Sequence, residues 1–408
     1  MSGETEFSLR SVAMAAFVPS TLYGLSQGAV LPVIALSALD RGASSAVAAL
    51  IASLLGTGAI VTNIPSGILA TRVGENRAML VASAVTILGL LVCLVPVHSQ
   101  PAGLLLLGLA ILLLGAASSV FNLARQAYLT EAVPARLRAR ALSTLGGMSR
   151  IGVFLGPFLS AVAIHRWGLP GAYVVSLVAM VAAAFIIARI PDLEAGEQRR
   201  KAAAEVTTRV VLRDYRRVFL TLGLGIVLLC AVRQTRQVVI PLWAAHIGLS
   251  SASSSVIYGL AGGIDVVTFY PAGRVMDRQG RRWVAVPCVL LLAASFVAMT
   301  WSHGTVTLAL AACVMGFGNG IGSGIVMTLG ADTSPAVGRY AFLGIWRELA
   351  DVGSAVGPLI LSAVTALAGL ATGFRFSGVL GVAAAGALWR WIPRDVTLDR
   401  TRTRGPRA

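Results

Sequence analysis

Charged residues are scarce in this chain. Asp, Glu, Lys and Arg together make up 12% of its 408 residues, while hydrophobic residues make up 56%. Soluble globular domains carry roughly 25% charged residues. A chain this poor in charge, with a mean hydropathy of +0.81, is not expected to fold as a water-soluble domain.

Residues and motifs that commonly bind metals or cofactors are also few in this sequence. The four cysteines fall in apolar stretches and make no Cys-x-x-Cys pair, so the sequence predicts neither a disulfide framework nor a zinc site. The four histidines are scattered singly and suggest no metal site. No P-loop occurs in the chain. We therefore expect no cofactor, no metal and no use of ATP as the energy source.

Long apolar runs are what the sequence has in abundance. A helix needs about 20 apolar residues to cross a bilayer, and about twelve runs of this kind follow one another. They predict an all-α membrane protein with twelve transmembrane helices. The runs lie near 12–38, 45–70, 78–96, 102–130, 139–164, 172–190, 218–246, 253–275, 283–301, 306–331, 340–367 and 374–392.

The net charge of +16 comes from arginines that gather on one side of the predicted spans. Most lie in the stretch 191–217, in the loops after the fourth and eighth spans, and in the tail after residue 394. The opposite side has little more than Arg41, Arg166 and Arg375. This positive-inside bias predicts a multi-pass protein of the cell inner (plasma) membrane with both termini in the cytoplasm. It also argues against a nucleic-acid partner.

The polar stretch 191–217 divides the chain into two halves that resemble each other. We expect one six-helix bundle over 1–190, a basic cytoplasmic linker over 191–217, and a second six-helix bundle with a basic tail over 218–408. Two such pseudo-symmetric repeats place a substrate site at their interface, near the membrane midplane. The matched segments are Gly67-Ile-Leu-Ala-Thr-Arg-Val-Gly74 with Gly273-Arg-Val-Met-Asp-Arg-Gln-Gly280, and Gly152-x-x-x-Gly156-Pro157 with Gly353-x-x-x-Gly357-Pro358.

These motifs resemble those of the major facilitator superfamily, a family of twelve-span transporters, over essentially the whole chain. The loop after the second span is similar to the family signature Gly-x-Leu-Ala-Asp-Arg-x-Gly-Arg-Lys. Thr71 stands where that signature has an acid, which puts in doubt the acid's usual role of holding the inward-closed face together in the first half. The positions that fit are Gly67, Leu69, Ala70, Arg72 and Gly74 in the first copy and Gly273, Asp277, Arg278, Gly280, Arg281 and Arg282 in the second.

The glycines of the fifth span carry a second resemblance. Gly152, Gly156 and Pro157 are similar to the antiporter signature of proton-coupled drug exporters, with Ser160 where glycine is common. This resemblance favours export over import. A structural interpretation stands beside it, because Gly-x-x-x-Gly lets helices pack closely and Gly-Pro bends a helix, here and at Gly357-Pro358. The two interpretations are compatible.

Seven ionisable residues lie deep inside the predicted spans. A charge within the bilayer costs roughly 2.5–3.5 kcal/mol on insertion scales, so it persists where a partner, water or substrate receives it. Arg150, Arg233 and Arg236 are candidate substrate-binding residues. The alternative for Arg150 is an ion pair with an acid of the other half, and the alternative for Arg233 and Arg236 is pairing with Asp265 or a backbone carbonyl. The seven are Arg150, Arg233, Arg236, Asp265, Arg347, Glu348 and Asp351.

The three acids of this set are candidates for proton coupling. Burial opposes ionisation of a carboxyl group and a nearby cation favours it, so an acid between both effects can exchange a proton near neutral pH. Asp265 lies near the midplane of the eighth span, and a permanent salt bridge to an arginine is its alternative role. Glu348 and Asp351 are close enough to share a proton, although Arg347 and Asp351, four residues apart, can also pair locally.

Polar and aromatic residues of cavity-lining spans complete the candidate substrate site. Arg125, near the cytoplasmic end of the fourth span, either extends toward the membrane surface or takes the functional role that this helix position often has in the superfamily. Glu131 and Asp332 lie at loop mouths and are expected to tie helix ends to nearby arginines. The polar candidates are Tyr23, Gln27, Asn122, Asn319 and Trp346, each of which is also a common helix-packing residue.

The function implied by these features is secondary active transport. We expect a monomeric, proton-coupled antiporter that exports a small organic molecule, anionic or zwitterionic or drug-like, by alternating access. Its partners are then a small-molecule substrate, protons and the lipid bilayer. The alternatives are a proton-coupled importer of an organic anion and a membrane-embedded enzyme. A membrane-embedded enzyme would need a cluster of acids or histidines on a surface loop, whereas the loops between the predicted spans are short and dominated by arginine.

Overall fold

Helices build the described part of the protein. The computed structural model describes residues 16–96, 100–133, 138–189, 208–322, 324–335 and 339–392. Within these ranges, twelve helical segments are long and apolar enough to cross a membrane. The prediction of an all-α membrane protein with twelve spans is confirmed. Most of the expected basic linker and the basic tail lie outside the described residues.

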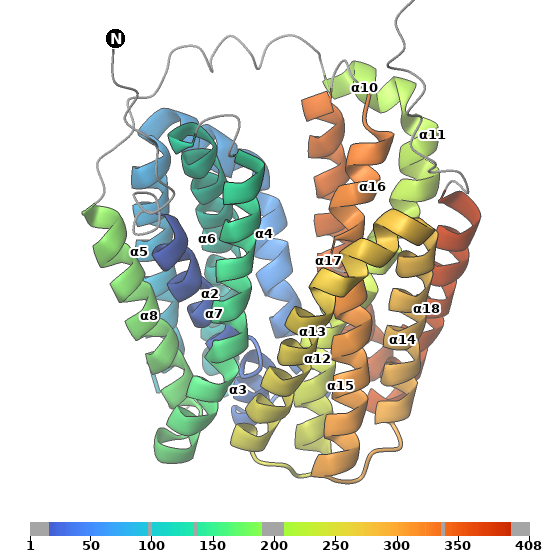
Figure 1. Cartoon of the computed structure of the whole chain (residues 1–408). Coiled ribbons are helices and arrows are strands. Elements are labelled where there is room, and N and C mark those ends of the chain that lie inside the picture. Colours follow the sequence, from blue (N-terminus) through green and yellow to red (C-terminus); the bar gives the residue numbers. More distant parts are fainter. Residues whose placement is uncertain are drawn as a thin grey trace, which may run out of the picture.

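Two groups of helices stand side by side (Figure 1). The first half begins with a span that is broken at residues 31–33 into two helices, α2 and α3. The remaining spans of this half are single helices. The helices of the first half are α2 (Val18–Val30), α3 (Ile34–Asp40), α4 (Ser45–Val73), α5 (Glu75–Leu94), α6 (Gln100–Ala132), α7 (Arg138–Trp167) and α8 (Pro170–Ala188).

The second half also contains six spans and begins with two short helices, α10 and α11. Its tenth span, predicted as one run near 306–331, is broken around Gly322 and Gly324 into α15 and α16. The helices of the second half are α10 (Thr208–Asp214), α11 (Arg216–Val218), η3 (Phe219–Gly223), α12 (Leu224–His246), α13 (Ser251–Gln279), α14 (Arg282–Met299), α15 (Thr305–Ile321), α16 (Ile325–Thr333), α17 (Arg339–Ala368) and α18 (Leu370–Trp391).

The repeat is visible in the way α4 and α13 begin and end. Both helices have 29 residues, and both start after a serine, Ser44 or Ser250, whose side chain accepts a hydrogen bond from a backbone N–H of the first turn. Such a cap satisfies a donor that the helix leaves free. Both helices end at a glycine with positive φ, +90° at Gly74 and +99° at Gly280. Only glycine adopts this conformation readily, so it ends both helices at equivalent places.

Helices α7 and α17 form a second matched pair. Each has 30 residues with one internal proline. A β-carbon at Gly152 would overlap the carbonyl oxygen of Thr21 on α2, and one at Gly353 would overlap that of Val227 on α12. The glycines therefore let α7 pack directly against the backbone of α2, and α17 against that of α12, as the packing interpretation predicts.

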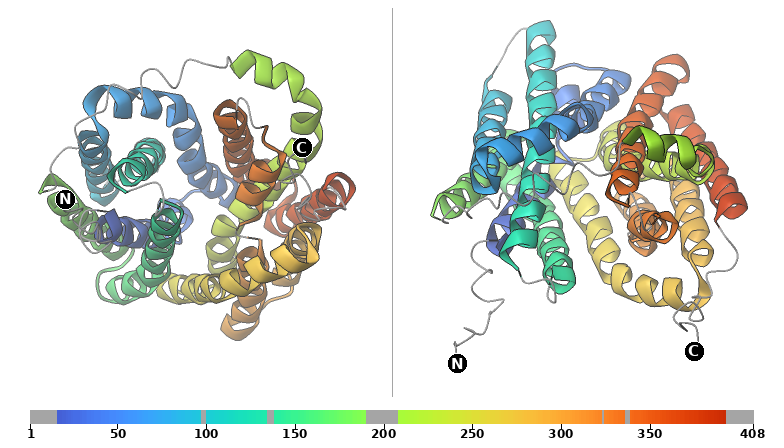
Figure 2. Two further views of the ribbon diagram at one scale, coloured as in Figure 1. Left: turned by 45° about the horizontal axis from the view of Figure 1, so that its top comes forward. Right: turned by 90° about the horizontal axis from the view of Figure 1, so that it is seen from above.

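The two halves meet through α4 against α17 and through α7 against α13. Figure 2 shows the same two groups from two further sides. On α17, the hydroxyl of Ser362 donates to the carbonyl of Ala46 on α4 over 2.8 Å. Across α7 and α13, the rings of Phe154 and Phe158 lie against Gly263 and Gly259. A site between the halves is thus walled by helices from both repeats.

Candidate functional site

A cavity of about 310 Å³ lies between the two halves. Ligand sites in proteins have volumes of about 300–1,000 Å³, so this cavity accommodates a small molecule. The first half contributes residues of α6 and α7, and the second half contributes residues of α12, α13 and α15. The lining residues are Arg125, Gly146, Ser149, Arg150, Val153, Phe154, Pro157, Arg233, Arg236, Tyr258, Gly262, Asp265, Val266 and Asn319.

The charge of this cavity is strongly positive. Arg125, Arg150, Arg233 and Arg236 line it, and among its lining residues Asp265 is the acid that faces them. Three positive charges are therefore left without a matching carboxylate in the wall. Four of the residues predicted as deep charges from the sequence, Arg150, Arg233, Arg236 and Asp265, converge here from three different helices.

On the side of the second half, the charges are tied together through Asn319. Its side-chain amide donates to Oδ2 of Asp265 over 2.5 Å, and its Oδ1 accepts from Nε of Arg233 over 2.8 Å. Nη2 of Arg236 lies 3.7 Å from Oδ2 of Asp265. Nη1 of Arg233 also donates to the carbonyl of Gly322 over 3.3 Å. The break between α15 and α16 thus presents a backbone acceptor to an arginine of α12.

On the side of the first half, the arginines have weaker protein partners. The guanidinium of Arg150 lies over the ring of Phe269, 3.9 Å from its centroid, and makes no hydrogen bond or ion pair in the described part of the chain. Its charged neighbours are Asp265 and Arg233. Arg125 is only 7% exposed, so it does not extend to the membrane surface. Its Nη2 donates to Oδ1 of Asn122 over 2.9 Å.

Three other candidates lie away from this cavity. Tyr23 stacks on Phe121 with ring centroids 4.1 Å apart, and the amide of Gln27 donates to the Tyr23 hydroxyl over 2.7 Å. Both residues line a hollow of about 20 Å³ inside the first half, which is large enough for water but not for an organic ligand. Trp346 is buried inside the second half, where its Nε1 donates to the carbonyl of Val326 over 2.8 Å.

The acids of α17 form a separate polar group between α17 and α4. Asp351 accepts a hydrogen bond of 2.6 Å from the amide of Asn63, and Glu348 lies beside the same amide. Nε of Arg347 lies 4.0 Å from Asp351, the local pair that their spacing allows. Ser119 of α6 donates to Oδ1 of Asn63 over 2.5 Å. Asn63 and Ser119 were not identified from the sequence, because polarity alone does not show which uncharged residues of a span face a partner.

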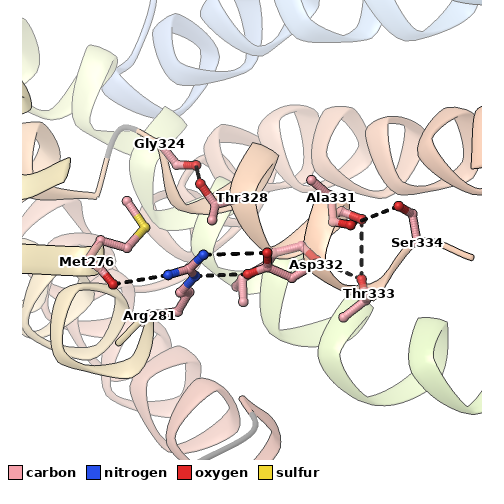
Figure 3. Close-up of polar contacts among 10 residues, drawn as sticks. Met276, Arg281, Gly324, Thr328, Ala331, Asp332, Thr333 and Ser334 are labelled. Atoms are coloured by element: carbon pink, nitrogen blue, oxygen red, sulfur yellow. Dashed lines mark hydrogen bonds and ion pairs between the residues drawn. The ribbon is translucent and has the colours of Figure 1, made fainter. Parts of the chain in front are cut away.

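The loop motifs lie at one end of the helices, away from the cavity. Arg72 and Arg278 are exposed, whereas the surroundings of positions 67, 273 and 277 lie outside the described side chains. In the second half, Nε of Arg281 pairs with Oδ2 of Asp332 over 2.9 Å, and its Nη1 donates to the carbonyl of Met276 (Figure 3). The prediction that Asp332 ties a helix end to an arginine is confirmed.

The sequence of this chain matches the family described as the Major Facilitator Superfamily over residues 16–278 and 222–407. The chain belongs to this superfamily. As a superfamily member it is a multi-pass membrane transporter of small molecules and not an enzyme. The narrower resemblance to drug exporters rests on the glycines of α7 and stays a prediction.

Relatives of known structure or description agree with this fold. The chain is 23% identical over 364 residues to the probable metabolite transport protein CsbC of Bacillus subtilis (strain 168), covering 80% of this chain and 71% of that protein. The D-xylose-proton symporter superposes with a TM-score of 0.71 at 15% identity, covering 95% of this chain and 98% of that one. The human organic anion transporter MFSD10 (TETRAN) superposes with a TM-score of 0.65 at 18% identity, covering 94% of this chain and 100% of that one.

Proposed function

We propose that this superfamily member is a secondary active transporter that binds a small organic anion or zwitterion in the cavity between its halves. The observation that carries this proposal is the charge of the cavity, where four arginines face one aspartate. An anionic ligand supplies the countercharge that the wall lacks. A lipophilic cation in the same space would meet an excess of like charge.

The chemistry of arginine supports an anionic ligand. A guanidinium holds a carboxylate or phosphate through two parallel hydrogen bonds, which combine attraction with orientation. Arg150 and Arg125 have donor groups that are not used by hydrogen bonds or ion pairs in the described structure. The name of the organic anion transporter of similar fold accords with this ligand class.

Transport by alternating access fits the way in which the halves meet. The contacts of α4 with α17 and of α7 with α13 join two bodies that are each held together by close glycine packing. Transporters of this architecture rock one repeat against the other around a central site. We propose that the halves rock against each other about these two contacts, so that the cavity opens in turn to the two sides of the membrane.

Proton coupling is assigned to Asp265, with Glu348 and Asp351 as a second group. Asp265 contacts Asn319 and Arg236 within the cavity, so a change in its protonation alters the charge that the ligand meets. The α7 glycine signature favours export by antiport, which is the first candidate mode.

Import by proton symport is the second candidate mode, and the position of Asp265 favours it. A proton on Asp265 removes a negative charge from the wall of the proposed anion site. Proton and anion then strengthen each other's binding by the same factor, as thermodynamic linkage requires. Mutual strengthening is the property of a symporter, whereas an antiporter needs its two substrates to compete.

Proteoliposomes that contain a pH-sensitive dye distinguish these modes. Radiolabelled mono- and dicarboxylates are added outside, and uptake is measured together with the internal pH. Anion uptake with acidification of the lumen indicates symport, and uptake with alkalinisation indicates antiport. Uptake of lipophilic cations, with no uptake of any carboxylate, would refute the anionic substrate.

A further inference from the structure

The four arginines of the cavity differ in how well the protein itself satisfies them. Arg233 donates from Nε to Asn319 and from Nη1 to the carbonyl of Gly322. Arg236 forms an ion pair with Asp265, and its Nε is buried without a hydrogen-bond partner in the described part of the protein. Arg125 has two such donors and no ion pair there: it uses only Nη2, which donates to Asn122, while its Nε and Nη1 are buried and have no hydrogen-bond partner among the described residues.

The burial of Arg125 makes its two unsatisfied N–H donors costly. The residue is 93% buried, since only 7% of its surface is exposed, and a buried polar group without a hydrogen-bond partner is costly. Its guanidinium carbon lies 5.7 Å from the ring centroid of Tyr23 and 5.9 Å from that of Phe121. Aromatic faces attract a cation, but they do not occupy the N–H groups of Nε and Nη1.

The stacked rings and Asn122 hold Arg125 in place at the wall of the cavity. Tyr23 and Phe121 lie nearly parallel, with an interplanar angle of 12°, and are both buried. Asn122 lies one turn before Arg125 on α6 and accepts from its Nη2. The guanidinium is therefore oriented by its surroundings before any ligand arrives, which lowers the entropy that binding must overcome.

We propose that Arg125 anchors the anionic group of the transported molecule, a carboxylate or a phosphate, with Asn122 as its positioning residue and Arg150 as a second donor from the same half. The inference rests on the proposed function of an anion transporter and goes further, because it assigns the anion to the first half. Arg233 and Arg236 then serve chiefly to hold Asn319 and Asp265. This division gives each half a different part of the site.

The test uses the full-length protein in detergent and three probes of the same shape. Benzoate, benzamide and benzamidine are anionic, neutral and cationic, and inorganic phosphate serves as the alternative anion. Binding is measured by isothermal titration calorimetry on wild type, Arg125→Gln, Arg233→Gln and the control Arg189→Gln, which changes an arginine at the end of α8. We expect wild type and the control to bind benzoate or phosphate and not benzamidine.

Arg125→Gln is expected to weaken anion binding by about tenfold or more, the factor that corresponds to losing a charged hydrogen bond. Arg233→Gln is expected to have a smaller effect. Binding by Arg125→Gln within about threefold of wild type, with a larger loss in Arg233→Gln, overturns the inference but leaves anion transport in place. If wild type binds neither benzoate nor phosphate, the proposed function fails together with the inference.

A second measurement separates binding from a structural role. Without ligand, Arg125→Leu is expected to unfold at the same temperature as wild type or a higher one, because it removes a buried cation with unsatisfied donors. Added benzoate or phosphate should raise the unfolding temperature of wild type and not that of Arg125→Leu. A ligand-free unfolding temperature several degrees below wild type, or failure of the variant to fold, would show that Arg125 stabilises the structure and would overturn the assignment.

Discussion

Asn63 of α4 donates a hydrogen bond of 2.6 Å to Asp351 of α17 and thereby links the two halves of the transporter. The hydroxyl of Ser119 donates to Oδ1 of Asn63 over 2.5 Å, so both the amide nitrogen and the amide oxygen of Asn63 are hydrogen-bonded. The contact joins residues that are 288 positions apart in the chain. If the halves separate along α4 and α17 during transport, this hydrogen bond must break.

Replacement of Asn63 by leucine should weaken the contact between the halves. A hydrogen bond to a charged group contributes about 1.5–3 kcal/mol, and we expect about 1 kcal/mol here because the Asp351 side chain is 31% exposed. The apparent unfolding temperature of the purified protein should fall. Thr57→Val serves as the control, since among the described residues the Thr57 hydroxyl donates to the carbonyl of Ser53 within α4 itself. Equal unfolding temperatures for both variants and wild type would contradict a linking role.

Asp265→Asn should abolish proton-driven transport and leave substrate binding or exchange measurable. Asparagine keeps an acceptor for Asn319 but cannot take up and release a proton. Glu348→Gln should have a weaker effect of the same kind. The measurement is uphill uptake into proteoliposomes under an imposed pH gradient, with exchange at equal pH as the control. Uphill transport by Asp265→Asn at the wild-type rate would place the proton site elsewhere.

Arg233→Lys or Arg236→Lys should weaken substrate binding although the charge is kept. A lysine ammonium cannot reproduce the planar arrangement in which Arg233 donates to both Asn319 and Gly322. We expect a loss of about threefold to tenfold, corresponding to one ordinary hydrogen bond, which is less than the loss from Arg125→Gln. Tight binding of a lipophilic cation that is indifferent to Arg150, Arg233 and Arg236 would favour cationic drug export instead.

Gly156→Ala should destabilise the first half. A β-carbon at this position would meet the backbone of α2 around Gly28 and Ala29, and forcing extra atoms into a packed contact costs about 1–3 kcal/mol. Gly147→Ala, on the same helix, is the matched control because a β-carbon there meets nothing within 4 Å. The unfolding temperature should fall for the first variant and not for the second. The reverse order would contradict glycine-mediated packing of α7 on α2.

The basic linker should face the cytoplasm. A cysteine introduced at Glu197, which lies outside the described residues, should react only with a membrane-permeant thiol reagent in intact cells. The native cysteines are replaced first. A cysteine introduced into the loop between α7 and α8, which is expected on the outer side, is the control that an impermeant reagent should label. Efficient labelling at position 197 by an impermeant reagent would reverse the proposed orientation.

The sequence by itself determined the spans, the repeat and the close-packed glycines. These features depend on local properties that can be read along the chain. An apolar run of sufficient length must form a helix in a bilayer, and a glycine that ends α4 recurs at the end of α13 because both positions need positive φ. The deep charges were also evident, since a charge within an apolar run stands out at once.

Only the tertiary structure decided which of these groups meet. Asp265 and Asn319 come together across α13 and α15, while Glu348 and Asp351 lie at Asn63 in a different place. Trp346 faces the interior of its own half instead of the cavity. Hydropathy fixes how deep a residue lies in the membrane, but the rotation of each helix about its axis follows from side-chain packing with distant segments. That rotation gave Arg233 its partners, and it left Nε and Nη1 of Arg125 buried at the cavity wall without a hydrogen-bond partner among the described residues.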